Sequence, residues 1–370
     1  MALKNISIIG LGLIGGSIAK ALKNGYSSKH ENLKRDFSSL IIKGYDREEI
    51  INAALSDGTI DRRLASAEEA WDSDVIFLCL PTELSLKYFF ELSPIIKEGA
   101  VISDVCGVKG VFEAGWKSLN SKGYYIGGHP MTGKETSGYQ GSDPLLFENS
   151  VYIISESAKQ LKVLDEFLEI IKYMGARIRF LDPFVHDRVI SRVSHLPQLL
   201  SVALVNTAAG NEEGIDYLDF AAGGFRDMTR IASSNFDIWE PVIKLNKDEI
   251  ISSIKLLRDN LTKIEEYVSA NDTEKLNSLF QSARNKRDEI PKNTKGFINP
   301  LSDIFIYVKD EPGVLSKLTT LLYRNKINIK DLELLKIREG TGGTFRISFE
   351  NEETALLAKK LVEESGFATK

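Results

Sequence analysis

Short apolar runs alternate with amphipathic stretches through the first half of the chain. The runs are rich in Val and Ile and are bounded by Gly, Pro, Asp or Ser, which is typical of buried strands. Strands that alternate with helices predict an α/β fold with a mostly parallel, doubly wound sheet of the Rossmann type. The pattern predicts strands at 6–10, 40–45, 75–80, 100–104, 124–127 and 151–155, and helices at 15–24, 47–55, 84–96 and 158–174.

The pattern becomes almost entirely helical near Asp182 and stays so to about residue 292. Asp182 followed by Pro183 is typical of a helix N-cap with proline in the first turn. Pro197 lies inside an apolar stretch and should kink a helix or begin a new one. An apolar stripe indicates either core packing or a dimer interface and consists of Leu199, Leu200, Ala203, Leu204 and Thr207.

A polar break at 291–296 separates this helical part from a compact C-terminal pattern. That pattern, with a short last strand near Phe367, predicts a ferredoxin-like βαββαβ domain. Its strands are expected at 304–308, 328–337 and 344–349, its helices at 314–324 and 352–363, and a hairpin at 340–343. The chain therefore divides into a dinucleotide-binding domain at 1–181, an all-α domain at 182–295 and a third domain at 300–370.

Composition narrows the possible partners. The 370 residues carry a net charge of −5 and no long run of Lys or Arg, so nucleic acid is not an expected partner. Two cysteines, Cys79 and Cys106, are too few for a disulfide framework or a zinc site, which favours the reducing cytoplasm and no metal. The apolar segment 6–21 contains four glycines and is too short to span a bilayer, so no membrane association is expected.

A glycine-rich motif joins the first predicted strand to the first predicted helix. In that context a G-x-G-x-x-G sequence is typical of dinucleotide binding, because its glycines allow a tight turn, a close pyrophosphate and close helix packing. The helix N-terminus supplies free N–H groups for the phosphates. The expected cofactor-binding residues of this motif are Gly10, Leu11, Gly12, Leu13, Ile14 and Gly15.

Asp46 ends the second predicted strand, where a carboxylate can bind the adenine ribose of a dinucleotide. A carboxylate there favours NAD, because it would repel the 2′-phosphate of NADP, although the adjacent Arg47 weakens this argument. Cys79 and Pro81 follow the strand at 75–80, at the crevice where the nicotinamide should pass. Cys79 is interpreted as a small buried hydrophobe rather than a nucleophile.

Two of the four histidines are candidates for chemistry. His129 follows a strand in a Gly-Gly-His-Pro turn aimed at the crevice. An imidazole there can accept a hydroxyl proton during hydride transfer, and a structural role in the turn is the alternative. His195 is either an active-site or a packing residue. His30 falls in a polar insertion, and the pattern assigns no role to His186.

Two arginines four residues apart, Arg226 and Arg230, would share one face of a helix. They follow a pair of glycines, and two guanidiniums placed there could clamp a dicarboxylate substrate. The alternative is a pair of structural salt bridges.

Several motifs, in this order, resemble those of prephenate dehydrogenases over about residues 3–290. The resemblance implies NAD-dependent oxidative decarboxylation of prephenate to 4-hydroxyphenylpyruvate in tyrosine biosynthesis. The motifs are Gly-Leu-Gly-Leu-Ile-Gly-Gly-Ser at 10–17, Ser-Asp through Val-Lys at 103–109, Gly-Gly-His-Pro-Met-Thr-Gly at 127–133, Ser-His-Leu-Pro at 194–197, Gly-Gly-Phe-Arg-Asp-Met-Thr-Arg-Ile-Ala at 223–232, and then Trp239.

The resemblance implies roles for individual residues. His129 matches the family's catalytic histidine, which bonds the ring hydroxyl as hydride leaves for NAD, and His195 matches a second active-site histidine. Arg230 matches an arginine that binds a substrate carboxylate, with Arg226 as its neighbour. Trp239 matches a residue near the substrate pocket.

One departure from the family concerns Cys106-Gly107, where many members have Gly-Ser. That serine helps to organise the catalytic histidine and the nicotinamide. A water molecule or Ser103 could take its place here.

Residues 304–365 resemble an ACT domain, in which amino acids bind at domain interfaces near the first strand–helix loop. The implied effector is tyrosine, the pathway product, and both the helical and the ACT domains suggest a homodimer. The expected effector site consists of Asp310, Pro312, Gly313, Val314, Leu315, Asn328 and Ile329.

Two other functions stay open at this point. Arogenate dehydrogenase shares the mechanism but acts on a substrate with an amino group in place of the keto group. A nucleotide-sensing regulator belongs to a different class, and His129 and Arg230 argue against it because a sensor needs neither residue.

Overall fold

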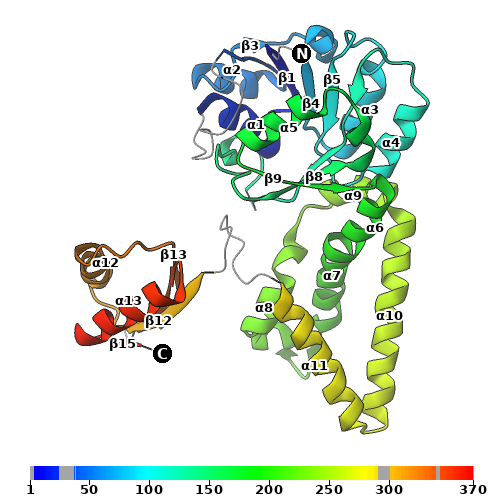
Figure 1. The fold of residues 1–370 in the computed structure, drawn as a ribbon. Coiled ribbons are helices and arrows are strands. Elements are labelled where there is room, and N and C mark those ends of the chain that lie inside the picture. Colours follow the sequence, from blue (N-terminus) through cyan, green and yellow to red (C-terminus); the bar gives the residue numbers. More distant parts are fainter. Residues whose placement is uncertain are drawn as a thin grey trace. The chain divides into compact units, whose positions relative to one another are not determined.

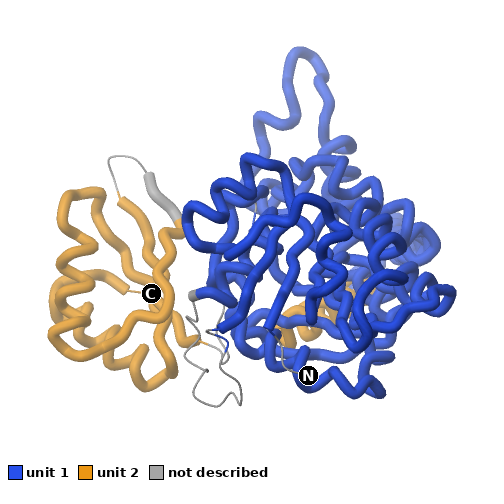
Figure 2. Tube along the Cα trace, turned by 90° about the horizontal axis from the view of Figure 1, so that it is seen from above, with its two compact units in different colours: residues 1–273 blue, residues 274–370 orange. Residues whose placement is uncertain are grey.

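The computed structural model of the chain describes residues 4–24, 37, 39–134, 136–290, 301–338 and 342–369. Contacts divide the chain into two compact units, residues 1–273 and 274–370 (Figure 2). The predicted polar break at 291–296 and His30 lie outside the described residues. Among the helices of the described part, none combines the length and the apolar character needed to cross a membrane.

The first unit is built on a parallel sheet with the order β3-β2-β1-β4-β5-β6. This is the doubly wound order of dinucleotide-binding folds, which reverses between β1 and β4. Both of these strands are almost fully buried because helices cover both faces of the sheet (Figure 1). The strands are β1 Asn5–Ile9, β2 Ile41–Tyr45, β3 Arg62–Arg63, β4 Val75–Leu78, β5 Val101–Asp104 and β6 Tyr124–Tyr125.

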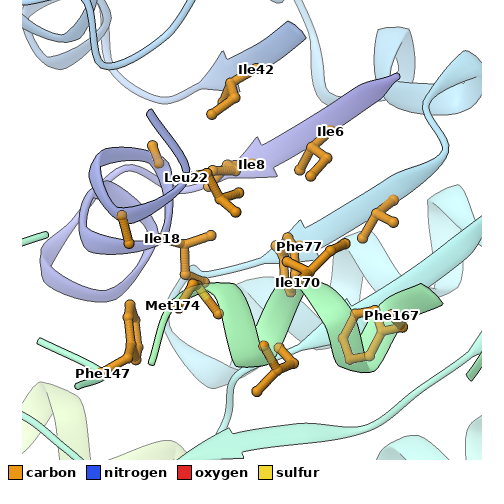
Figure 3. Packing of buried hydrophobic residues seen from close by; sticks show 14 of the residues in the cluster. Ile6, Ile8, Ile18, Leu22, Ile42, Phe77, Phe147, Phe167, Ile170 and Met174 are labelled. Atoms are coloured by element: carbon orange, nitrogen blue, oxygen red, sulfur yellow. The ribbon is translucent and has the colours of Figure 1, made fainter. Parts of the chain in front are cut away.

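Helices α1 and α5 pack side by side on one face of this sheet. Figure 3 shows Ile18 of α1 and Ile170 of α5 beside Ile8 and Phe77 of the central strands. The other face is covered by α3 and α4. The sequence pattern predicted α3 but not α4. These helices are α1 Leu13–Asn24, α2 Glu48–Ser56, α3 Thr82–Leu92, α4 Gly110–Lys117 and α5 Leu164–Tyr173.

A second sheet, with the order β7-β8-β9, follows the parallel sheet along the chain. β7 (Gly128–Pro130) is antiparallel to β8 (Val151–Ser155), and β9 (Arg177–Leu181) is parallel to β8. The prediction included β8 but neither of its neighbours. His129 therefore lies in a short strand, paired with Ile153, rather than in an isolated turn.

The helical region begins as predicted. The Asp182 carboxylate accepts hydrogen bonds from the N–H groups of Phe184 (2.9 Å) and Val185 (3.0 Å). One π-helical turn, Ser191–His195, connects α6 to α7, so Pro197 lies in the first turn of a new helix. The elements are α6 Pro183–Ile190, α7 Leu196–Ala208, β10 Asn211–Glu212, β11 Ile215–Asp216, α8 Gly223–Thr229, α9 Phe236–Leu245, α10 Lys247–Ser269 and α11 Thr273–Glu289.

The C-terminal part of the second unit is the predicted βαββαβ domain, with a core of its own and the sheet order β13-β14-β12-β15. Its second strand begins at Asp331, so Asn328 and Ile329 precede the strand instead of opening it. Residues 340 and 341 of the predicted hairpin lie outside the described residues. The elements are β12 Ser302–Val308, α12 Val314–Arg324, β13 Asp331–Arg338, β14 Gly342–Phe349, α13 Glu352–Glu364 and β15 Ala368–Thr369.

Candidate active site

The glycine-rich loop crosses the switch point of the sheet, between the ends of β1 and β4. Gly10 has φ +98°, and a Cβ there would lie 2.8 Å from the carbonyl carbon of Cys79. A Cβ on Gly15 would lie 1.9 Å from the Gly10 carbonyl oxygen, so both positions need glycine for packing. A Cβ on Gly12 would meet nothing within 4 Å. The loop therefore leaves room for a pyrophosphate to approach its backbone.

Asp46 is fixed against this loop. Its carboxylate accepts hydrogen bonds from the N–H groups of Leu11 (2.6 Å) and Arg47 (2.7 Å). The exposed Arg47 guanidinium lies 3.2 Å from a carboxylate oxygen of Glu49, so the cation beside Asp46 has another partner. Helix α1 begins at Leu13, which leaves the N–H groups of its first turn without partners inside the helix. The free N–H groups of α1 fit the phosphates of a dinucleotide, and the Asp46 carboxylate fits its ribose.

The end of β4 forms the other wall of the crevice. The Cys79 N–H donates to the Ile9 carbonyl (2.8 Å), and Pro81 is the N-cap residue of α3. Burial, with the nearby Cys106 and Asp104, raises the pKa of the Cys79 thiol well above its usual value. A thiol that stays protonated is a poor nucleophile, which agrees with a packing role for Cys79.

His129 lies beside the loop that follows β5. A Cβ on Gly107 would lie 3.9 Å from Nε2 of His129, so this edge of the ring faces the loop. A Cβ on Gly128 would lie 2.9 Å from the Asp104 carbonyl oxygen, which explains how β7 packs closely against the end of β5. His129 is thereby held at the carboxyl edge of the sheet, where doubly wound folds bind their ligands.

A second histidine contacts the other edge of the His129 ring. Nδ1 of His129 lies 2.8 Å from Nε2 of His186, and the two rings meet edge to face. Nδ1 of His186 lies 2.8 Å from Oδ1 of Asp187. His186 is fully buried in α6. The three side chains form one hydrogen-bonded chain that starts at His129 and ends at a carboxylate.

Asp187 extends this chain into the helical region. Its carboxylate accepts hydrogen bonds from the N–H groups of Lys109 (2.7 Å) and Gly110 (2.8 Å), at the start of α4. Its own carbonyl accepts from the Asn246 amide (2.9 Å), which also lies 3.2 Å from Nδ1 of His195. The structure therefore brings His129 and His195 into one network although the chain separates them widely.

His195 and Trp239, two residues of the predicted substrate site, lie together. Their rings meet edge to face with centroids 6.0 Å apart. Burial lowers the pKa of His195 to about 4, although the nearby Asp187 acts in the opposite direction. Burial also lowers the pKa of His186, and it lowers that of His129 to well below its usual value. All three imidazoles are therefore neutral at pH 7.

A buried ion pair supports the loop beneath His129. The Lys109 ammonium contacts the Asp104 carboxylate, and both side chains are fully buried. Tyr125 donates its hydroxyl to the other oxygen of Asp104 (2.7 Å). Ser103, one expected substitute for the family's serine, is buried in β5, and its hydroxyl lies 3.5 Å from the Asp104 carbonyl oxygen. The contact to the His129 ring comes instead from His186.

Arg226 and Arg230 are exposed residues of α8 and of the 3₁₀ turn that follows it. Nε of Arg226 donates to the Ala221 carbonyl (3.2 Å). The turn that contains Arg230 is tied to α7 by a hydrogen bond from Gln198 to the Ile231 carbonyl (2.9 Å). Arg230 is thus held against the helix that begins directly after His195.

Comparison with known proteins gives matches along most of the chain. The nucleotide-binding domain of prephenate dehydrogenase matches residues 30–180, the dimerization domain of prephenate dehydrogenase matches 182–282, and the ACT domain matches 302–364. The chain is 34% identical to the prephenate dehydrogenase of Bacillus subtilis over 364 residues, which are 97% of this chain and 95% of that protein. The chain belongs to the prephenate dehydrogenase family.

Solved structures agree with this assignment. The prephenate dehydrogenase of Aquifex aeolicus, in complex with hydroxyphenyl propionate and NAD⁺, has 28% identity and a TM-score of 0.69, and the match covers 78% of this chain and 99% of that one. The arogenate dehydrogenase of Synechocystis has 26% identity and a TM-score of 0.64, with 77% and 99% covered. Like the other members of the prephenate dehydrogenase family, the chain is an oxidoreductase.

The ACT domain of this family member contains a cavity of about 490 Å³. Four of the expected effector residues line it: Asp310, Gly313, Val314 and Leu315. Its opposite side is formed by Leu334 and Phe345 of the sheet, together with the start of β14. Pro312, Asn328 and Ile329, the other expected effector residues, are not among the lining residues.

His186 and Asp187 are the site residues that sequence reasoning missed. They lie on the buried face of α6 with Pro183 and Ile190, at the spacing of one helical stripe. A His-Asp pair on an otherwise buried helix face was the available signal, because buried polar side chains need partners. The partner, His129, could not be identified from periodicity alone.

Proposed function

We propose that this enzyme catalyses the NAD-dependent oxidative decarboxylation of prephenate to 4-hydroxyphenylpyruvate, a step of tyrosine biosynthesis. The observation that carries the proposal is the position of His129, whose Nε2 edge faces the loop after β5 at the ligand-binding edge of the sheet. The matches to the nucleotide-binding and dimerization domains of prephenate dehydrogenase support the choice of substrate.

The residues at the switch point fit NAD as the cofactor. The space above Gly12 and the first turn of α1 would hold the pyrophosphate, and the Asp46 carboxylate would accept the ribose hydroxyls. Leu11, Leu13 and Ile14 would contribute backbone, while Cys79 and Pro81 would border the nicotinamide. Bound NAD supplies the acceptor for the hydride.

His129 acts on the ring hydroxyl of the substrate. Because its imidazole is neutral at pH 7, one ring nitrogen has a lone pair, and we assign it to Nε2, which would accept a hydrogen bond from this hydroxyl. The bond strengthens as hydride leaves the carbinol carbon and the ring carboxylate departs as carbon dioxide. His195, Trp239 and the arginines enclose the rest of the substrate, with Arg230 on a carboxylate and Arg226 beside it.

Arogenate is the alternative substrate, since the matched Synechocystis structure is named an arogenate dehydrogenase. Steady-state formation of NADH and NADPH from prephenate and from arogenate tests both choices. We expect prephenate with NAD to give the highest kcat/KM.

Asp46→Ser should erode the preference for NAD, whereas Arg47→Ala should leave it unchanged because Glu49 already pairs with this arginine. Equal use of NADP by the wild type would contradict the role of Asp46.

Replacing His129 tests the hydroxyl contact. His129→Asn should lower kcat by ~10²–10⁴-fold, the usual contribution of a positioned acid–base group. Affinity for NAD, measured by titration, should hardly change, because we assign NAD binding to the glycine-rich loop and Asp46. Turnover close to that of the wild type would remove His129 from the mechanism.

Replacing Arg230 tests the carboxylate contact. Arg230→Ala should raise the KM for prephenate roughly 10- to 150-fold, since a hydrogen bond to a charged group contributes ~1.5–3 kcal/mol. NAD affinity should stay the same. A lower thermal unfolding midpoint with an unchanged KM would instead favour a structural salt bridge.

We infer further that tyrosine is the effector of the ACT domain and that the enzyme is a cytoplasmic homodimer. Both cysteines are free thiols, which agrees with a reducing compartment. The dimerization-domain match coincides with a helical region that exposes large apolar side chains, which a second copy would cover. These include Phe220, Met228, Phe236 and Ile238.

Gly313 allows a test of the tyrosine site. It has φ +87° at the start of α12, where the first N–H groups can bind a carboxylate, and it lines the cavity. Gly313→Val should weaken inhibition by tyrosine, because the new side chain strains the loop and enters the cavity. Gly366→Val is the matched control, since Gly366 has φ +89° but does not line the cavity. Identical inhibition constants in all three proteins would exclude this site.

A further inference from the structure

The His186–Asp187 pair has no part yet in the proposed reaction. His186 has no exposed surface, and the Asp187 side chain is only 10% exposed. Burying two ionisable groups is costly unless they are well paired, so their placement behind His129 calls for a physical account. The directions of the hydrogen bonds that join His129, His186 and Asp187 explain this placement.

The hydrogen bonds of Asp187 determine which nitrogens of His186 and His129 carry protons. The N–H groups of Lys109 and Gly110 donate to one oxygen each of Asp187, and a backbone amide can only donate. Both oxygens of Asp187 are therefore acceptors. A carboxylate has no proton to donate, so its third contact, with Nδ1 of His186, is made by an N–H group on the ring.

The next link follows from the first. A neutral imidazole carries one proton, so with Nδ1 of His186 protonated its Nε2 is an acceptor. The contact of 2.8 Å between this atom and Nδ1 of His129 therefore requires a proton on Nδ1 of His129. The remaining nitrogen of His129, Nε2, is left with a bare lone pair.

Burial keeps the His129 and His186 rings in the neutral form. It is the largest cause that lowers the pKa of each. The nearby His186, Lys109 and His195 side chains lower the pKa of His129 further. On His186, Lys109 also lowers the pKa, whereas Asp187 and Asp104 raise it. The lone pair on Nε2 of His129 is thus available at neutral pH.

We propose that His186 and Asp187 are positioning residues that fix the tautomer of His129, so that Nε2 is the atom that accepts the substrate hydroxyl. The proposal rests on the proposed dehydrogenase function. In it, the contact that His186 makes with Nδ1 of His129 orients the ring. It also accounts for Gly107, which has no side chain to orient the ring from the Nε2 side.

The proton balance of the reaction is consistent with this role. The hydride leaves with the electron pair of the C–H bond, and the pair from the broken C–CO₂ bond completes the aromatic ring. The hydroxyl proton moves towards Nε2 of His129 and returns to the phenol oxygen, so no proton is released. The positive charge that develops on His129 meanwhile is shared through His186 with the Asp187 carboxylate.

Two replacements of His186 separate its two contacts. In His186→Asn the amide can still donate to Asp187 but cannot reach His129, whereas the longer His186→Gln can place a carbonyl oxygen near the position of Nε2. We expect kcat to fall ~10- to 10³-fold in the Asn variant, within the ~10²–10⁴-fold that an acid–base group contributes. The Gln variant should recover part of this loss, with KM values little changed.

A double-mutant cycle tests whether His186 acts through His129. In the His129→Asn background, His186→Asn should lower kcat no further, because the ring that it orients is gone. Ser191→Ala is the control on the same stretch of helix, since its hydroxyl bonds Ser253 and should affect only the thermal midpoint. Independent, multiplicative losses at the two histidines would overturn the proposal.

Nitrogen NMR gives a test that needs no substrate. With ¹⁵N-labelled histidine, the chain has only four rings to assign. We expect the Nδ1–H form of His129 in the wild type at pH 7 and a mixture of tautomers in His186→Asn. An Nε2–H form in the wild type would overturn the proposal. If the enzyme turned over neither prephenate nor arogenate, the proposed function would be refuted. The tautomer of His129 measured by NMR would still hold.

Discussion

The proposed active site depends on one buried carboxylate. Asp187 receives two backbone N–H groups from the start of α4, the His186 ring from its own helix, and through its carbonyl the Asn246 amide that also contacts His195. These contacts join the nucleotide-binding sheet to the helical region, so they determine how His129 and the proposed substrate residues face one another. Removing the carboxylate would leave two amides and an imidazole buried without partners, at ~1–3 kcal/mol each.

Close backbone packing sets the position of the cofactor relative to this network. The Gly10 and Gly15 contacts bring β1, α1 and the end of β4 together without side chains between them. The loop after β5 then lies next in the sheet order, and the buried Asp104–Lys109 pair fixes it under His129. A hydride donor on one side of the crevice and an acceptor on the other can meet only if both loops are rigid, which is what this packing provides.

The sequence predicted the parts of the site that depend on local chemistry. The glycine loop, Asp46 and His129 follow predicted strands, so their place at the edge of the sheet could be inferred. Helix α4 and the strands beside β8 were missed because they are short and only partly periodic. The His129–His186 contact joins residues 57 positions apart through two elements whose packing no periodicity reveals. Asn328 and Ile329, which a matching motif assigns to the effector site, do not line the cavity of the ACT domain, and their role stays a prediction.

The lowered pKa of His129 bears on the catalytic role that we propose for it. The phenol of the product resembles the tyrosine side chain, whose pKa is about 10. Its oxygen is therefore far more basic than a buried imidazole whose pKa lies well below 6.5. A proton transferred fully to His129 would return at once, so the role we propose for the ring is that of a hydrogen-bond acceptor whose bond is strongest while the hydride is leaving. A bond of this kind depends on geometry more than on basicity, which is why a fixed tautomer matters more here than a raised pKa.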